Sequence, residues 1–278
     1  MPNISKEKGV IMARKKKEQG DFYDTAFGKC EKREEFESHE LYLYSEKNPL
    51  EFYESIECVI RNNRQLAKMG ENMSFSDINF IYNGVHAIAG GNPARNIHIK
   101  NCTFKFIGGS VWSKEKKIRF GNAVECWNIA ENVTVENCVF DDIYDSAVTH
   151  QGGKTCKPAK NFIIKNNVFK KCGMAAYEQR DLMPLYAEFF GNICENAGEG
   201  FSRLGEEMPR SSEIWPQPIG HHIFLWRINN PTENGGIKIG NNVFGDAIFG
   251  KAIYSIIDGE SRKQLIIGKN EYKGRFIE

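Results

Sequence analysis

The stretch NIHIKNCTF at 96–104 decides the fold, because it returns nearly unchanged as NVTVENCVF at 132–140 and as NFIIKNNVF at 161–169. Four weaker copies begin at residues 72, 186, 236 and 264, so successive copies start 24, 36, 29, 25, 50 and 28 residues apart. A supersecondary unit that recurs at intervals of this size is the sequence signature of a solenoid. The chain is therefore expected to wind into coils, one for each copy.

Each copy of the repeat has the pattern of a β-strand. Apolar residues alternate with polar ones, as with Ile97 and Ile99 or Val133 and Val135. Alternation with a period of two residues indicates a strand rather than a helix. Stacking such strands in parallel, one per coil, pairs each backbone edge with the next coil and buries the apolar face in a narrow cylinder. The sequence therefore predicts an all-β fold, a parallel β-helix.

Three positions of the repeat are expected to stack like on like from coil to coil. Asparagine tolerates left-handed backbone at a bend, and its amide can bond to the asparagine above and below. The bend position holds Asn101, Asn137, Asn166 and Asn241, and the next position holds Cys102, Cys138, Asn167, Asn192 and Asn242. A third ladder, predicted to lie in the core, consists of Phe80, Phe104, Phe140, Phe169 and Phe244.

The composition fits a soluble globular protein and gives no sign of nucleic-acid binding. The chain is 41% hydrophobic and 26% charged, with a formal net charge of +1. Its one basic run, at 14–17, lies in a polar N-terminal stretch and is expected to be solvated. No apolar stretch approaches the ~18–20 residues that cross a bilayer, and the N-terminus lacks the apolar core of a signal peptide. We therefore expect neither nucleic-acid nor membrane partners.

The chain is expected to divide into three parts. Residues 1–20 are predicted to be a disordered polar segment, residues 21–70 a lead-in or cap, and residues 71–278 the β-helix. A cap is expected because an open terminal coil exposes core and unpaired strand edge. Either residues within 21–70 supply this cap, or the chain is a piece of something longer. Loops at 110–122 and 203–232 are predicted to leave the cylinder and to shape a groove.

The eight cysteines form no CxxC pair, and two of them, Cys102 and Cys138, fall at the repeat position that follows the bend. This pattern favours reduced, packed thiols over disulfides or a zinc site. Asp141 and Asp142 are expected to cap a turn, although paired aspartates could also hold Ca²⁺. A calcium ion is therefore possible but not indicated, and we predict no metal and no other cofactor.

One column of polar residues carries the candidate chemistry. Counting nine residues on from the end of a copy gives residues 149, 178 and 203, and aligning AVE at 123–125 with AVT at 147–149 adds residue 125. The predicted column is Glu125, Thr149, Glu178 and Arg203. Asp145 precedes the same strand as Thr149. We take Glu125, Asp145 and Glu178 as the candidate catalytic residues.

The spacing of these carboxyl groups suits glycosidic bond hydrolysis. Adjacent coils lie ~4.8 Å apart, so Glu125 and Glu178 would be ~9–10 Å apart at the backbone and roughly 6–10 Å apart at their carboxyl groups. That range overlaps the ~6.5–9.5 Å of inverting glycosidases, whereas a pair that includes Asp145 could reach the ~5 Å of retaining enzymes. Neighbouring carboxylates raise one another's pKa, which supplies a general acid.

Aromatic and hydrogen-bonding residues flank this column. Sugars stack their apolar faces on aromatic rings and bond through their hydroxyls to planar polar groups, and guanidinium groups pair with carboxylates. Each residue also has a structural alternative, such as packing under a loop for Trp127 or bonding a turn for His150. The candidate substrate-binding residues are Trp112, Trp127, His150, Gln151, Tyr177, Arg180, Arg203 and His222, with Tyr144 and His221 beside them.

Several further motifs occur in a characteristic order along the chain. They are DFYDTAFGKC at 21–30, LYLYSEKNP at 41–49, FIYNGVHAI at 80–88, IGGS at 107–110, GNAVECW at 121–127, IYDSAVTHQG at 143–152 and AAYE at 175–178. Over roughly residues 20–250 the chain resembles the right-handed parallel β-helix proteins of the pectate-lyase-like superfamily. The resemblance is closest to glycosidase-like members found among bacterial polysaccharide-degrading proteins. It implies a right-handed solenoid that acts on carbohydrate.

Three functions from different classes fit this resemblance. The first is a glycoside hydrolase acting on a polysaccharide or oligosaccharide through paired carboxylates, which the carboxylate-rich column favours. The second is a polysaccharide lyase or uronate epimerase, which needs a base such as Arg or Lys. The third is a non-catalytic carbohydrate-binding or truncated β-helix. The chain is expected to be a monomer, and its localisation stays open, because members of the superfamily are usually secreted whereas no signal peptide is visible here.

Overall fold

The computed structural model describes residues 65–90, 93–113, 118–200 and 220–277, together with 22–24, 41–43, 46–48 and 51. The chain divides into a smaller unit, residues 1–58 with 113–115, and a larger unit formed by the rest. In the smaller unit β1 (Phe22–Asp24) pairs with β2 (Leu41–Leu43) in antiparallel fashion. The disordered segment predicted at 1–20, and most of the lead-in at 21–70, lie outside the described residues.

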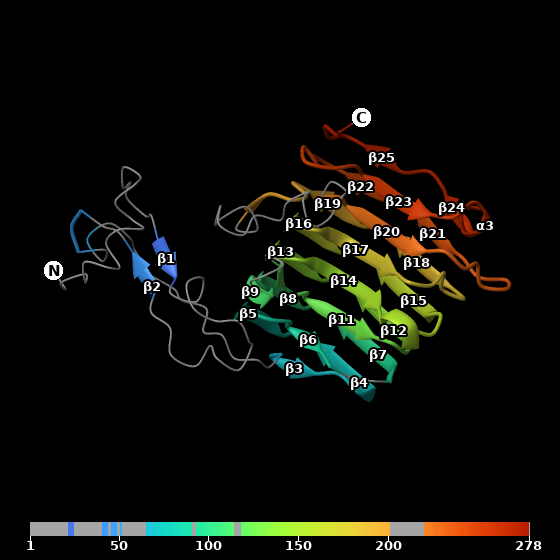
Figure 1. The fold of residues 1–278 in the computed structure, drawn as a ribbon, viewed down its shortest axis with the longest axis horizontal. Coiled ribbons are helices and arrows are strands. Elements are labelled where there is room, and N and C mark those ends of the chain that lie inside the picture. The colour runs from blue at the N-terminus through green and yellow to red at the C-terminus, as the bar shows by residue number, and fades with distance from the viewer. Residues whose placement is uncertain are drawn as a thin grey trace. The chain divides into compact units, whose positions relative to one another are not determined.

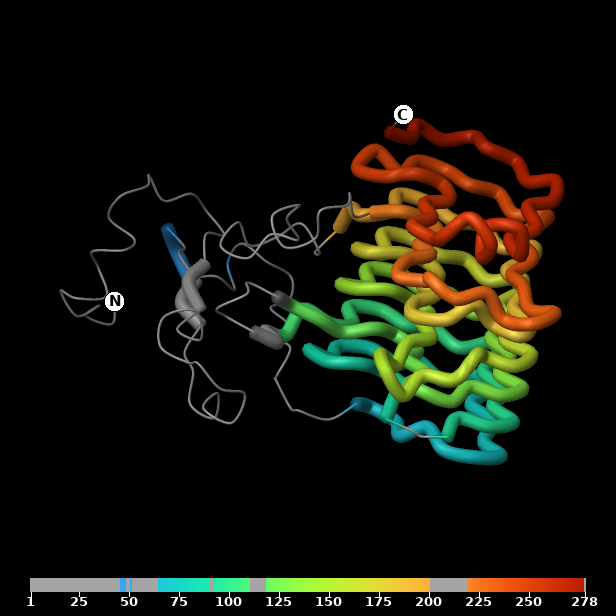
Figure 2. Tube along the Cα trace, turned by 45° about the vertical axis from the view of Figure 1, so that its right-hand side comes forward, coloured from blue at the N-terminus to red at the C-terminus, as the bar shows by residue number. Residues whose placement is uncertain are grey.

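The larger unit is a right-handed parallel β-helix, as predicted (Figures 1 and 2). Three parallel sheets of seven strands run along it, and each coil gives one strand to each sheet. Sheet 1 contains β3 (Ala67–Lys68), β6 (Ile88–Ala89), β11 (Val124–Trp127), β14 (Ser146–Gln151), β17 (Ala175–Arg180), β20 (Ile223–Ile228) and β23 (Ile253–Ile257). Sheet 2 contains β4 (Glu71–Ser76), β7 (Ala94–Lys100), β12 (Ala130–Glu136), β15 (Lys160–Lys165), β18 (Ala187–Phe190), β21 (Ile237–Gly240) and β24 (Leu265–Ile267). Sheet 3 contains β5 (Asn79–Asn83), β8 (Thr103–Ile107), β13 (Val139–Ile143), β16 (Val168–Cys172), β19 (Ile193–Glu195), β22 (Val243–Phe244) and β25 (Glu271–Tyr272).

Short elements interrupt the coils. The first predicted loop contains a two-stranded sheet of β9 (Ser110–Ser113) and β10 (Ile118–Phe120). A 3₁₀ helix, Gly153–Thr155, follows β14, and α3 (Gly259–Arg262) follows β23. The loop predicted at 203–232 is too long at its C-terminal end, because β20 already occupies part of it; its residues up to 219 lie outside the described part of the chain. The missed strand is almost continuously apolar, so it lacks the alternation that marks the repeat.

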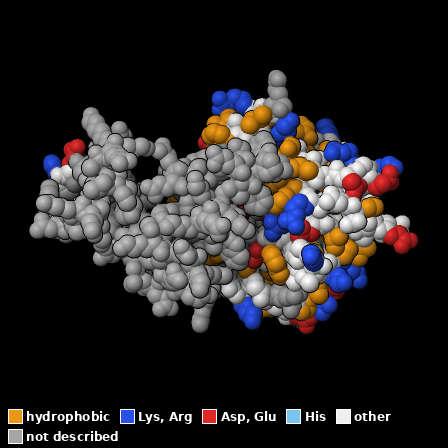
Figure 3. All heavy atoms as spheres, in the orientation of Figure 1, with side chains coloured by type: hydrophobic (Ala, Val, Ile, Leu, Met, Phe, Trp, Pro, Cys, Tyr) orange, Lys and Arg blue, Asp and Glu red, His pale blue; other side chains and the backbone are white. Residues whose placement is uncertain are grey.

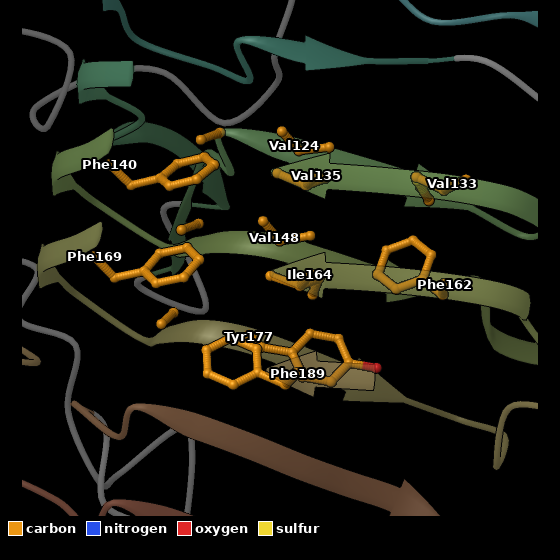
Figure 4. Close-up of a cluster of buried hydrophobic side chains, with 14 of the residues drawn as sticks. Val124, Val133, Val135, Phe140, Val148, Phe162, Ile164, Phe169, Tyr177 and Phe189 are labelled. Carbon is orange, nitrogen blue, oxygen red and sulfur yellow. The ribbon is translucent and has the colours of Figure 1, made fainter. Parts of the chain in front are cut away.

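The phenylalanine ladder forms the core, as predicted. Phe140 is fully buried, and its ring stacks between those of Phe104 and Phe169, with centroids 4.7 and 4.8 Å apart. Figure 4 shows Phe140 and Phe169 one above the other, with the valines and isoleucines of sheets 1 and 2 facing them across the interior. The register places Phe140 directly between Phe104 and Phe169 of the neighbouring coils, and Cys194 takes the same core position after Phe169.

The asparagine ladders are confirmed too. At the bend Asn101, Asn137, Asn166 and Asn241 all have φ between 53° and 56°. At the next position the buried amides bond to one another, with 3.1 Å from Asn192 Nδ2 to Asn242 Oδ1. An outer ladder that was not predicted lies at the first residue of the repeat, where left-handed asparagines also form hydrogen bonds from coil to coil. This ladder consists of Asn72, Asn96, Asn132 and Asn161.

Six cysteines belong to the described residues, and all six are free and buried, in agreement with the predicted packed thiols. Cys138 shows how such a thiol replaces an asparagine at the position after the bend. Its Sγ accepts a hydrogen bond from the backbone N–H of Cys102 at 3.4 Å, where asparagine in later coils uses its amide oxygen. Cys30 and Cys58 lie outside the described residues.

Candidate functional site

The predicted carboxylate column lies on the outer face of sheet 1. Glu125 on β11 is paired in register with Thr149 on β14, which is paired with Glu178 on β17. The column then becomes aromatic, because Phe224 on β20 follows Glu178. The fourth predicted member, Arg203, therefore does not hold the position beside Glu178, and it lies outside the described residues. The count of nine residues failed there because the coil between β19 and β20 carries a long insertion.

A second outward column runs beside the first. Trp127 on β11 is paired with Gln151 on β14, and Arg180 on β17 is paired with Trp226 on β20. The guanidinium carbon of Arg180 lies 5.0 Å from the centroid of the Trp226 ring, within the range of a cation–π contact. Phe224 stacks on Trp226 with centroids 5.4 Å apart. The outer face of sheet 1 thus combines carboxylates with aromatic rings and one guanidinium group.

Glu125 receives hydrogen bonds from three surrounding donors. Gln151 Nε2 donates to Oε1 at 2.9 Å, and Asn122 Nδ2 lies 3.5 Å from the same oxygen. His86 Nε2 lies 3.2 Å from Oε2. The backbone N–H of Asn122 donates to His86 Nδ1 at 3.0 Å, so Nδ1 carries no proton and Nε2–H must be the group that faces Glu125. The histidine is thus fixed as a donor to the carboxylate.

The pKa of Glu125 is raised above its usual range. Burial is the largest cause, since only 12% of the side chain is exposed. His86 and Arg180 lower the pKa, whereas the negative charges of Asp145 and Glu178 raise it. A partly buried carboxyl group whose pKa is raised near two other carboxyl groups has the properties of a general acid.

Glu178 is buried rather than open to solvent. It is only 2% exposed. Its Oε1 accepts a hydrogen bond from Trp226 Nε1 at 2.7 Å, and its Oε2 accepts from the hydroxyls of Thr149 at 2.8 Å and Ser146 at 3.2 Å. The tryptophan and phenylalanine of β20 pack beside it, which sequence spacing could not reveal. Glu178 is thus held rigidly between β14 and β20 and is a positioning residue rather than an open reactant.

We expect Glu178→Ala to lower the free energy of unfolding by about 3 kcal/mol or more. The substitution orphans the indole N–H and two hydroxyls in the interior, and each buried unsatisfied group costs ~1–3 kcal/mol. Glu178→Gln should cost less, because the new amide can accept from Trp226 and donate to the hydroxyl oxygens. Urea denaturation of the two variants beside the unchanged protein measures both effects. Equal stability of the alanine variant and the unchanged protein would contradict this reading.

Two polar atoms near Glu125 are buried without a hydrogen-bond partner. They are Gln151 Oε1, an acceptor, and Arg180 Nε, a donor. Buried polar groups are normally satisfied, so each such exception calls for an explanation. Arg180 Nε lies 3.8 Å from Asp181 Oδ2, which is an ion pair but too long for a hydrogen bond. Trp127, which is 41% exposed on the same face, offers a flat apolar surface for a sugar ring.

Several predicted binding residues lie in the interior and are corrected here. Tyr177 is fully buried in the core and stacks on Phe189 with centroids 5.9 Å apart. His150 also points inward, where Gln179 Nε2 donates to its Nδ1. His222 stacks on Phe244, and burial lowers the pKa of both histidines to about 4. Strand alternation sets their direction, since Tyr177 and His150 each adjoin an outward residue of the column.

Other predicted residues are placed only in part. Trp112 belongs to β9, but its side chain lies outside what the structure describes. Tyr144 is almost wholly buried, and His221 is buried against the ring of Tyr254. Asp145 lies one residue before β14, where its backbone N–H bonds to Gly121, and its charge acts on Glu125. Gln151, Trp127 and Arg180 remain with it as neighbours of Glu125.

Three residues of the site were not predicted from the sequence: His86, Asn122 and Trp226. Each lies outside the repeated block, in the segment that leads into sheet 1 or in the strand after the long insertion. His86 lies two residues before β6, whose Ile88 is paired with Val124 of β11. Following the column back by one coil would therefore have brought the motif FIYNGVHAI to the site.

The aspartates considered for calcium pair with lysines instead. Asp142 has a left-handed φ of 54° and lies 3.3 Å from Lys171 Nζ, and Asp141 lies 3.4 Å from Lys105 Nζ. Within the described residues no group of three or more His, Cys, Asp or Glu side chains could hold a metal ion. No helix among them is long and apolar enough to cross a membrane. Figure 3 shows basic, acidic and hydrophobic side chains interspersed over the described surface on its near side.

Comparisons of the chain with protein-family models, with curated proteins and with solved structures find no match. The function proposed for the protein therefore rests on the parallel β-helix and on the geometry of the outer face of sheet 1.

Proposed function

We propose that this protein is a glycoside hydrolase of the pectate-lyase-like superfamily that cleaves a polysaccharide or oligosaccharide on the outer face of sheet 1. The observation that carries this proposal is the position of Glu125, which is 12% exposed on the outer face of sheet 1 and is held by Gln151 and His86. Burial, with the charges of Asp145 and Glu178, raises the pKa of this carboxyl group. A carboxyl group with a raised pKa near a second carboxyl group is the arrangement that glycosidic bond cleavage requires. Trp127, Gln151 and Arg180 supply the stacking surface and the polar groups for a sugar.

The roles divide according to exposure. Glu125, with part of its side chain open to solvent, is the general acid that protonates the oxygen of the leaving sugar. Asp145 is partly exposed in the turn before β14 and acts as the second carboxylate, either on a water molecule or directly on the sugar. Glu178, buried beneath Trp226, contributes its negative charge and fixes the position of that ring. His86 and Gln151 hold the carboxyl group of Glu125 in place.

The proposed reaction is tested by incubating the purified protein with a panel of plant and microbial polysaccharides in heavy-oxygen water. A hydrolase releases oligosaccharides that carry the heavy oxygen at the new reducing end. A lyase releases unsaturated products without it, and a binding protein releases none. Protein with Glu125→Gln, purified in the same way, controls for contaminating enzymes. Unsaturated products would overturn the hydrolase in favour of a lyase, and the absence of products would favour a binding role.

His86→Phe is expected to move the upper pH limit of activity to higher pH. The general acid must be protonated, so activity falls as the pH rises through the pKa of Glu125. His86 lowers that pKa, and removing its N–H therefore raises the pKa further, while the new ring keeps the contact with Phe120. His98→Phe is the matched control, because His98 pairs with Glu136 on sheet 2. An upper limit that stays in place or moves down in the pH–rate profile would count against the assignment.

A further inference from the structure

The guanidinium group of Arg180 lies on the same face of sheet 1 as Glu125. Arg180 belongs to β17, one coil after Gln151, whose amide donates to the Glu125 carboxyl group. Its guanidinium carbon lies 5.0 Å from the centroid of the Trp226 ring, and the indole N–H of that ring donates to Glu178. Because Trp226 and Glu178 are themselves buried and hydrogen-bonded, they hold the arginine at a fixed place on this face.

Within the described residues, the contacts of this guanidinium group leave its hydrogen-bond donors unused. It makes the contact with Trp226 and an ion pair of 3.8 Å with Asp181, and neither of these is a hydrogen bond. Its Nε is buried without a hydrogen-bond partner. Asp181 has nearer partners, because the backbone N–H of Gly153 donates to it at 2.7 Å and Arg227 Nη2 lies 3.3 Å away. The positive charge of Arg180 is therefore only weakly paired.

The two glutamates of the site do not neutralise this charge by direct contact. Both carboxyl oxygens of Glu178 accept hydrogen bonds from other side chains, and those of Glu125 face Gln151 and His86. The Arg180 side chain is 18% exposed, so a ligand on this face can reach it. A guanidinium group offers paired N–H donors that match the oxygens of carboxylate and phosphate groups, and sulfate has the tetrahedral shape of phosphate. These features together are those of an oxyanion site.

We propose that the guanidinium group of Arg180 binds an oxyanion beside Glu125. The oxyanion is either an acidic substituent of the sugar or a free inorganic ion, since both offer the oxygens that a guanidinium fork recognises. In the first case the hydrolase acts on an acidic polysaccharide, a conclusion that rests on the proposed function. The binding of the oxyanion itself does not depend on hydrolysis.

Oxyanion binding and protonation of Glu125 favour each other. Arg180 lowers the pKa of Glu125, and a bound oxyanion offsets that positive charge, so the pKa rises when the site is filled. By linkage, the protein with Glu125 protonated binds the oxyanion more tightly than the protein with Glu125 ionised. An acidic ligand therefore helps to keep the proposed acid in its protonated form. The other charged or titratable groups around this pair are His86, Asp145, Cys156, Glu178, Asp181 and Arg227.

NMR titrations with sodium sulfate, sodium glucuronate and glucose, at constant ionic strength, test the site through the indole N–H signals of the four tryptophans. Sulfate and glucuronate are expected to shift the Trp226 signal and to compete, whereas glucose does neither. Arg180→Gln should weaken the binding of both anions at least about tenfold, because it removes charge-assisted hydrogen bonds. Arg95→Gln is the matched control, since it removes the same charge on sheet 2, where Arg95 pairs with Glu71 and Glu131; it should bind like the unchanged protein.

The titrations also separate the two sources of the oxyanion and the two proposals. Binding of glucuronate assigns the site to a substituent of the sugar, and binding of sulfate alone assigns it to a free ion. The proposal is overturned if neither anion binds, or if Arg180→Gln binds them as the unchanged protein does while circular dichroism shows that it is folded. Because no turnover is measured, a failure to hydrolyse polysaccharide overturns the proposed function and leaves the oxyanion site standing.

The coupling to Glu125 is tested by repeating the sulfate titration at a series of pH values. The affinity for sulfate should rise as the pH falls through the pKa of Glu125, because the ionised carboxylate repels the anion. Glu125→Gln cannot ionise, so its affinity should depend much less on pH. A pH dependence that persists unchanged in this variant would overturn the coupling.

Discussion

Phe140→Ala is expected to lower the free energy of unfolding by about 3–5 kcal/mol, the usual cost of removing a buried phenylalanine side chain. The side chain is fully buried and stacks on Phe104 and Phe169, so its removal leaves a cavity between two rings. The backbone around this cavity is held by hydrogen bonds to the coils on both sides. The cavity can therefore collapse only slightly, which places the cost in the upper part of the range for core substitutions.

Urea denaturation followed by circular dichroism measures the effect. Val139→Ala is the matched control, since it lies in the same strand but points outward and is 38% exposed. It should change the free energy of unfolding by no more than about 0.5 kcal/mol. A loss of less than about 1 kcal/mol for Phe140→Ala would show that the ladder contributes little to the core.

The repeat predicts the fold because the same types of residue form the bend, the strands and the core in successive coils. Left-handed asparagine, alternating apolar residues and a core phenylalanine recur at fixed positions, so a sequence comparison of the chain with itself aligns sheets 2 and 3. Where the repeat is interrupted, the prediction fails. The sequence predicts a loop over part of β20 and places Arg203 in the column, because the long insertion before β20 shifts the count of residues.

The sequence predicts only part of the site, because the repeat determines which residues are aligned but not which of them are buried. The in-register column of Glu125, Thr149 and Glu178 follows from the repeat. The burial of Glu178 does not follow from the repeat, because it depends on the aromatic rings of β20 that pack beside Glu178. Tyr177 and His150 were expected at the surface but point inward, since neighbours along a strand face opposite sides. His86 contacts Glu125 from another coil, so the sequence around Glu125 alone does not predict this contact.

Glu125→Gln is expected to lower kcat/KM for polysaccharide by about 10²–10⁴-fold, the usual contribution of a general acid. The amide cannot give a proton to the leaving sugar. The substitution is sterically matched, and the Gln151 amide can turn so that its unpaired Oε1 accepts from the new amide while His86 still donates to the remaining oxygen. The fold and the ligand contacts should therefore survive, so that kcat falls and KM stays nearly constant.

Leaving-group dependence tests the role of Glu125 more sharply than the loss of rate alone. A glycoside with an acidic aryl leaving group needs little protonation, so Glu125→Gln should slow its cleavage far less than that of a natural linkage. The upper limb of the pH–rate profile should also disappear in this variant. The matched control is Glu136→Gln, because Glu136 pairs with a histidine in the same way but on sheet 2; its activity should be unchanged. If the Glu125 variant lost activity equally on both kinds of substrate, the residue would be a binding or structural group and not the acid.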